Sequence, residues 1–226
     1  VHCAFETNFQ NAKKSYSTNI IGSKKVIKLA REINSYFLFI SSMSSHKQAL
    51  STYGIHKLLV EKELDLSRDG IISPGLIIGE GGIFLQTIKI IKSMPFIPLF
   101  FGGKQKIQTA NVEDVVEAII LMIKTKFKGK VMFGESCSLL LRDFYRLIAI
   151  SLNKKPIFIR LPGNIILLLI KSMEKLNLKL PLSSDNLYGI KKLKDFQVDE
   201  DLERLGVFPL SAQDSIDSFP WKKYFK

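Results

Sequence analysis

The feature that most constrains this chain is a continuous apolar run, Tyr36 to Ile40, which separates an amphipathic segment from a polar loop. From Asn19 to Ile33 apolar residues recur at helical spacing, with lysine and arginine on the opposite side. The loop, Ser41 to Ser45, follows the run directly. A strand that is apolar on both faces is typical of a parallel sheet covered by helices on both sides. Ligands bind at the carboxyl ends of such strands, so the serine loop is a candidate site.

The alternation of strand and helix continues along the first 135 residues and predicts a parallel α/β sheet. A smaller, mainly helical lobe is expected over residues 136–226. Ser73 to Gly75 reads as a turn, and Pro95 and Pro98 predict an irregular stretch up to Gly103. The expected strands are Ile71–Ile72, Leu76–Ile78, Ile107–Ala110, Val131–Phe133 and Pro156–Ile159. The expected helices are Thr52–Leu66, Ile83–Ser93, Val112–Lys124 with Asn111 as its N-cap, Arg142–Leu152 and Asn164–Leu176.

Composition excludes several classes of protein. With 46% hydrophobic and 24% charged residues among 226, the chain can bury a sizeable core and is too apolar to be disordered. Cys3 and Cys137 are too few for a disulfide scaffold, so a reducing, cytoplasmic compartment is favoured, and the three histidines lack ligand spacing, so no metal is expected. The longest apolar run of the C-terminal half, Ile165 to Ile170, falls far short of the roughly 20 residues that span a bilayer. The first residues show no secretory signal.

The charge is strongly basic, with 33 Lys and Arg against 21 Asp and Glu and a net charge of +12. Because the lysines are scattered singly and in pairs, without interleaved aromatics, they indicate a generally basic surface and no nucleic-acid partner. Affinity for anionic ligands or lipid headgroups stays open. An apolar and basic segment, Leu161 to Lys179, leaves a helix that docks on a membrane surface as one interpretation.

Tyr53 and Lys57 are the pair that suggests chemistry. Four residues apart in a predicted helix, they face the same way. A nearby ammonium group favours the phenolate and lowers the pKa of a tyrosine, which makes general acid/base work on a substrate hydroxyl feasible. Ser42, just past the apolar strand, could bind the same substrate oxygen. The alternative is a surface tyrosine and a surface lysine on an amphipathic helix.

Six motifs, in order along the chain, resemble the extended short-chain dehydrogenase/reductase superfamily, and within it the NAD-dependent epimerase/dehydratase family. The resemblance covers roughly residues 1–124 well and the remainder weakly. Its motifs are a strand end that passes the cofactor (Val1–Ala4), an Asn-Val-x-Gly-Thr helix start (Asn19–Ser23), the catalytic serine or threonine strand end (Phe39–Ser42), Tyr-x-x-x-Lys (Tyr53–Lys57), Arg-Pro-Gly (Pro74–Gly79) and Val-x-Asp-Val (Asn111–Val115).

The resemblance implies a Rossmann-like, doubly wound parallel sheet and an NAD or NADP cofactor. It implies that Ser42 bonds the reacting hydroxyl or carbonyl, that Tyr53 transfers its proton, and that Lys57 binds the nicotinamide ribose. Asn19 is either a helix start or a catalytic support. The implied activity is an epimerase or reductase acting on a nucleotide sugar, and a homodimer is a further expectation. The implied cofactor-binding residues are Ala4, Tyr53, Lys57, Pro74, Gly75 and Leu76.

The chain also departs from the family pattern. The Asp-Glu pair of the 4,6-dehydratases is Met43-Ser44 here, which disfavours dehydration. The connection from Leu66 to Ser73 looks about five residues short, which predicts a stunted strand. No glycine fingerprint for the pyrophosphate is present, and Gly79 to Gly82 is no substitute, so we expect the first βα units to lie upstream. These departures leave open a catalytically silent assembly or regulatory protein of the same family.

Overall fold

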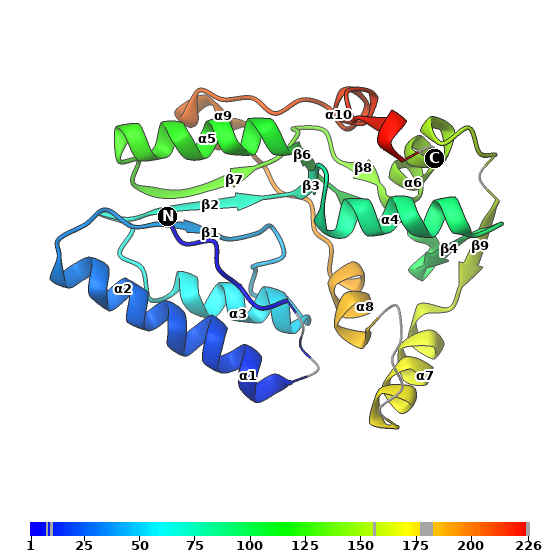
Figure 1. The fold of residues 1–226 in the computed structure, drawn as a ribbon, viewed down its shortest axis with the longest axis horizontal. Helices are drawn as coiled ribbons and strands as arrows, with labels where there is room; N and C mark the ends of the chain where they lie inside the picture. The colour runs from blue at the N-terminus through cyan, green and yellow to red at the C-terminus, as the bar shows by residue number, and fades with distance from the viewer. Residues whose placement is uncertain (8, 10, 156, 177–182, 225–226) are drawn as a thin grey trace.

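The computed structural model describes residues 1–7, 9, 11–155, 157–176 and 183–224. Its centre is a parallel sheet with the strand order β1 (Leu38–Ile40), β2 (Gly70–Pro74) and β7 (Gly129–Phe133), shown in Figure 1. A single parallel bridge joins His2 to Phe39 of β1. The N-terminal segment therefore runs beside β1, as a strand end there predicts, although only His2 of its first four residues is buried.

Helices cover both faces of this sheet, because successive residues of each strand point to opposite faces. On one face Leu38 and Ile72 belong to a core shared with α5 and α9. On the other face Phe39 and Ile71 belong to a core shared with α2 and α3. Figure 1 shows these two layers, and the prediction of a strand buried on both sides is confirmed. The helices span Ser23–Glu32 (α2), Thr52–Glu61 (α3), Val112–Thr125 (α5) and Asp199–Leu205 (α9).

Besides the cores on the two faces of the sheet, a third core lies beyond the carboxyl end of the main sheet, where Phe84, Phe144 and Ile216 pack together. Its helices are α4 (Gly82–Ser93), α6 (Leu141–Ser151) and α10 (Ala212–Asp217). The parallel pairs are β3 (Leu76–Ile78) with β6 (Thr109–Asn111) and β4 (Ile97–Phe100) with β9 (Phe158–Leu161); the antiparallel pair is β5 (Lys106–Ile107) with β8 (Leu139–Leu140). The remaining elements are α1 (Ala12–Tyr16), a π-helical segment (Ser17–Gly22), α7 (Gly163–Lys175), α8 (Ser184–Lys191) and 3-10 turns at Phe101–Gly103 and Trp221–Lys223.

Most of the predicted helices form. Asn111 caps α5 as expected, because its side chain accepts the N–H of Glu113 at 2.9 Å. The predicted apolar helix over Asn164–Leu176 is α7, and the last residues of the segment ending at Lys179 lie outside the described residues. The strand predicted from Pro156 appears as β9, and Pro156 itself is outside the described residues.

Two strands correct the sequence predictions. β2 is five residues long and fully buried, so the short connection from Leu66 does not stunt it, and Ser73 and Pro74 belong to this strand and not to a turn. β4 forms inside the stretch predicted to be irregular. Among the described residues β4 pairs with β9 alone. Proline has no N–H to donate, and Pro98 is tolerated in β4 because the other edge of this strand needs no hydrogen bond.

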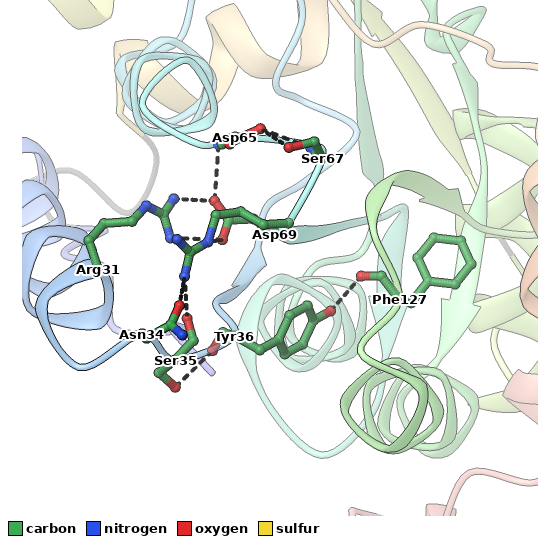
Figure 2. Close-up of polar contacts among 9 residues, drawn as sticks. Arg31, Asn34, Ser35, Tyr36, Asp65, Ser67, Asp69 and Phe127 are labelled. Carbon is green, nitrogen blue, oxygen red and sulfur yellow. Dashed lines mark hydrogen bonds and ion pairs between the residues drawn. The ribbon is translucent and has the colours of Figure 1, made fainter.

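A buried carboxylate fixes the amino end of β2, and Figure 2 shows its contacts with Arg31 and Asp65. Asp69 is fully buried and accepts hydrogen bonds from Arg31 of α2 on both carboxylate oxygens. The N–H of Asp65 donates to the same carboxylate at 3.0 Å, and the Arg68 guanidinium lies 3.9 Å from it. Asp69 therefore joins α2 to the connection between α3 and β2.

Asp69→Asn is expected to lower the free energy of unfolding by about 3 kcal/mol, because it leaves the Arg31 guanidinium without its charge partner. Urea unfolding of the variant and the wild type measures the difference. Glu32→Gln on the exposed end of α2 is the control and should change the value by less than about 0.5 kcal/mol. Equal stability of Asp69→Asn and the wild type would contradict a stabilising role for the pair.

Candidate active site

The serine loop is held against the carboxyl end of β2. The backbone N–H of Ser41 donates to the Ile72 carbonyl at 2.7 Å, and that of Met43 donates to the Pro74 carbonyl at 2.9 Å. Between them Ser42 is half-buried, and its hydroxyl accepts the N–H of Ser44 at 3.1 Å. The loop is thus a continuation of the β1–β2 pairing, and its conformation is fixed by backbone hydrogen bonds.

The first turn of α3 lies directly on this loop. Ser51 caps the helix by accepting the N–H of Gly54 at 3.2 Å. Gly54 has no room for a side chain, because a Cβ atom there would overlap the Ser44 carbonyl. This close approach places Tyr53 beside Ser42 in the wall of one cavity, where the Ser42 hydroxyl acts to lower the pKa of Tyr53.

Burial governs the protonation of Tyr53. Loss of solvent raises the pKa of Tyr53 above its usual value of 10.0, and the hydrogen bond from Ser42 opposes that shift only in part. The phenol therefore holds its proton at neutral pH. This differs from the expectation drawn from Tyr-x-x-x-Lys spacing, in which the neighbouring ammonium lowers the pKa of the tyrosine.

Lys57 is buried among aromatic rings, with only 3% of its surface exposed. Its ammonium donates to the Ile40 carbonyl at 2.6 Å and lies 4.1 Å from the Phe5 ring centre and 4.7 Å from that of Phe39. The Tyr53 ring centre is 5.7 Å away. Desolvation lowers the pKa of Lys57 from 10.5 to about 8, so its charge is lost in mildly alkaline solution.

Glu61 extends this helix face by one more turn and was not singled out by the sequence analysis. Its carboxylate accepts a hydrogen bond from the Ser41 hydroxyl and forms an ion pair with Lys130, in which the Nζ and Oε2 atoms are 2.8 Å apart. The same negative charge raises the pKa of Lys57 and so opposes part of the desolvation. The spacing of four residues from Tyr53 to Lys57 and from Lys57 to Glu61 was the available signal.

These side chains line a cavity of about 210 Å³ at the carboxyl end of β1 and β2. Of the residues predicted for the site, Ser42, Tyr53, Lys57, Pro74 and Gly75 lie in its wall. The wall also contains residues of the predicted motifs to which no role was assigned, Cys3, Ile40, Ser41 and Ile77, and two residues outside every motif, Phe5 and Thr7.

Two predicted cofactor-binding residues lie outside this wall. Ala4 is exposed between the wall residues Cys3 and Phe5. Leu76 packs against the third core, which contains Phe84 and Phe144, and donates its N–H to the Gln108 carbonyl at 2.9 Å. Neither side chain contributes to the cavity.

Asn19 secures the N-terminal side of the cavity from the π-helical segment. Its fully buried amide donates to the Glu6 carbonyl at 2.9 Å and accepts the Glu6 N–H at 2.7 Å. It also lies 3.3 Å from the Nδ1 atom of His56 on α3. Asn19 therefore ties the segment that carries Phe5 and Thr7 to the helix that carries Tyr53. Within the described residues, no group of His, Cys, Asp and Glu side chains is arranged to hold a metal ion.

No protein-family model and no curated protein matches the sequence, but solved structures match it over almost its whole length. Pal from Bacillus thuringiensis has 17% identity, with 100% of this chain and 75% of that chain covered, at a TM-score of 0.72. The UDP-glucuronic acid 4-epimerase from Bacillus cereus, solved with UDP-glucuronic acid and NAD, has 14% identity, coverage of 96% and 72%, and a TM-score of 0.67. The NAD-dependent NDP-hexosamine 5,6-dehydratase TunA has 13% identity, coverage of 96% and 73%, and a TM-score of 0.67.

The chain therefore has a Rossmann-like α/β fold with a mainly helical C-terminal part. It is the fold of NAD-dependent nucleotide-sugar epimerases and dehydratases, as the order of the motifs predicted. The chain spans about three quarters of the length of these neighbours. Identities below one fifth establish the fold alone, and the chemistry has to be argued from the residues of the site.

The stability of the wild type is expected to rise relative to Lys57→Met as the pH increases from 8 to 10. The folded chain releases the Lys57 proton near pH 8, whereas the unfolded chain holds it up to about pH 10.5. In this window the unfolded state binds more protons, so the free energy of unfolding increases with pH, here by about 2 kcal/mol.

Urea unfolding at a series of pH values measures this difference between wild type and variant. Lys62→Met, at the exposed end of α3, serves as the control and should give a difference that does not change with pH. A difference for Lys57→Met that is equally flat would show that the Lys57 ammonium keeps its ordinary pKa.

Proposed function

We propose that this chain belongs to an NAD(P)-dependent epimerase or reductase that acts on a nucleotide sugar, with Tyr53 as the general acid and base. The observation that carries the proposal is the placement of Ser42 and Tyr53 beside the buried Lys57 ammonium in the wall of one cavity. The position at the carboxyl ends of parallel strands supports it, because ligands of α/β sheets bind there. The fold shared with NAD-dependent enzymes of nucleotide sugars supports the same class.

The cavity residues fit the nicotinamide end of a dinucleotide. Phe5, Ile40, Pro74 and Ile77 offer apolar walls to a flat ring, and the Lys57 ammonium offers donors to ribose hydroxyls. The volume of about 210 Å³ is below the roughly 300–1000 Å³ of whole-ligand pockets, so it suits the reacting end and not a complete dinucleotide. When bound, nicotinamide supplies or accepts the hydride. Neither NAD nor NADP is favoured by these residues.

The chain's own groups would manage the proton. The Ser42 hydroxyl would hold the reacting oxygen of the sugar beside Tyr53. Because burial keeps Tyr53 protonated, it is poised to donate to a carbonyl oxygen and to take the proton back from a hydroxyl in the reverse direction. The Lys57 charge would stabilise the phenolate while it exists.

The substrate class rests on the fold neighbours and on charge. The Bacillus cereus neighbour is bound to UDP-glucuronic acid, and the net charge of +12 favours an anionic sugar diphosphate over a neutral or cationic substrate. Met43 and Ser44 replace the acidic pair of 4,6-dehydratases, so epimerisation or reduction is preferred to dehydration. A homodimer and a cytoplasmic location stay predictions.

The second candidate is a catalytically silent protein of the same fold with an assembly or regulatory role. The observation that favours it is the state of the two ionisable groups. Burial raises the pKa of Tyr53 and lowers that of Lys57 to about 8, so each shift disfavours the charged form that a phenolate–ammonium pair requires.

Tyr53→Phe is expected to lower the turnover of UDP-sugars at least about 100-fold, because general acid/base catalysis contributes factors of roughly 10²–10⁴. NADH and NADPH oxidation or formation is followed by absorbance, and epimerisation by product analysis. Tyr16→Phe is the matched control: it also loses a hydroxyl, and its ring contacts His56 on the same helix α3. It should keep wild-type turnover.

Fluorescence titration with NADH separates the two candidates. Binding of NADH together with Tyr53-dependent turnover supports the enzyme. Binding without any turnover in the wild type favours the silent protein, and turnover that Tyr53→Phe leaves unchanged would remove Tyr53 from the mechanism.

A further inference from the structure

Helix α7 carries an exposed apolar stripe. Ile165, Leu168 and Leu169 of the helix and Leu176, directly after its last residue, recur at helical spacing, and 58%, 67%, 53% and 72% of their surfaces are exposed. Ser172, which lies among them, donates its hydroxyl to the Leu168 carbonyl and so has no need of water at that face. A contiguous apolar surface of this kind on a helix marks a place of interaction, unlike single exposed leucines.

The opposite side of α7 is attached to α8 by polar contacts. Lys171 donates to the Tyr188 hydroxyl at 2.5 Å, Lys191 donates to Asn164 at 3.0 Å, and the N–H of Ser184 donates to the Glu174 carboxylate at 2.8 Å. In Figure 1 α7 extends away from the central sheet, beside α8. The stripe is therefore presented outward by a helix that is already secured from behind.

Positive charge surrounds the stripe. Lys175 lies along its flank, and Lys104 and Arg160 line an open cavity of about 650 Å³ at the N-terminal end of α7. The carboxylate of Glu174, the acidic residue of this helix, accepts the hydrogen bond from the N–H of Ser184. Each lysine or arginine near an anionic membrane contributes roughly 1 kcal/mol of attraction, so this arrangement of charge matches acidic lipid headgroups.

α5 provides the contrast within the same chain. Val116, Ile120 and Ile123 are exposed to a similar degree there, from 42% to 46%. The first turns of α5 carry Glu113, Asp114 and Glu117, however, which repel an anionic surface. Both helices thus combine exposed apolar residues with lysine, but α5 has three acidic residues and Lys124, whereas α7 has Glu174 and two lysines.

We propose that α7 docks the protein on the surface of an anionic phospholipid bilayer, with the stripe in the acyl boundary and Lys104, Arg160 and Lys175 among the phosphates. The helix lies in the plane of the membrane, as amphipathic interfacial helices do. Within the described part of the chain, no helix is long and apolar enough to cross a bilayer. The docking places the enzyme fold at a membrane without altering the cavity at Tyr53.

Flotation of the whole chain with vesicles tests the proposal. The wild type should float with vesicles of phosphatidylcholine and phosphatidylglycerol in equal amounts, and bind at least tenfold less to phosphatidylcholine alone. The double variant Leu168→Gln and Leu169→Gln should lose at least tenfold in binding to the mixed vesicles. Both leucines are exposed, so the variant should keep the circular dichroism and unfolding midpoint of the wild type.

The double variant Ile120→Gln and Ile123→Gln on α5 is the control and should float like the wild type. Failure of the wild type to float overturns the proposal, as does equal loss in both double variants. Sedimentation analysis tests the alternative that a second copy of this chain covers the stripe. That alternative would be supported if the wild type does not float, sediments as a dimer, and becomes a monomer in the α7 variant. High salt should release the wild type, since part of the attraction is electrostatic.

Discussion

The structure depends on the pairing of β2 along both of its edges. β2 bonds to β1 on one side and to β7 on the other, and its five residues are fully buried. The serine loop continues this ladder, since Ser41 and Met43 donate to its last carbonyls. Asp69 fixes its other end through Arg31. The serine loop of the candidate site is thus positioned by β2, and Lys57 is held by the Ile40 carbonyl of the neighbouring strand β1.

The site itself is a balance between burial and charge. Lys57 is taken out of water and compensated by the Ile40 carbonyl, two aromatic rings and the nearby Glu61 carboxylate. Tyr53 is half-buried, and the resulting desolvation raises its pKa, so its proton is retained. Burying a lysine is unfavourable unless its charge is satisfied, so such a group beside a tyrosine and a serine indicates a functional site more than a purely structural one. The α7 surface shows the opposite arrangement, because apolar side chains there are exposed to water beside cations.

The sequence predicted the strands and helices that have a clear hydrophobic period. It failed to predict strand segments that contain proline or that depend on pairing with a distant strand. The run from Tyr36 to Ile40 could be assigned to a strand buried on both faces because hydrophobicity is a local property. β4 was missed because Pro98 is compatible with a strand once β9, about sixty residues later, supplies a partner on one edge. The length of β2 was missed for the same reason, since pairing with β7 extends it through Ser73 and Pro74.

The sequence by itself determined the α/β class, through the alternation of apolar strands with amphipathic helices, and the helical face that presents Tyr53 and Lys57 together, through their spacing of four residues. Only the tertiary structure decided that Ser42 reaches Tyr53, through the contact of Gly54 with Ser44, and that Phe5 and Glu61 join Lys57. It also placed Ala4 and Leu76 outside the cavity wall. Protonation, too, was a tertiary matter: the pKa of Tyr53 is set by how deeply the fold buries it, and desolvation cannot be read from spacing along a helix.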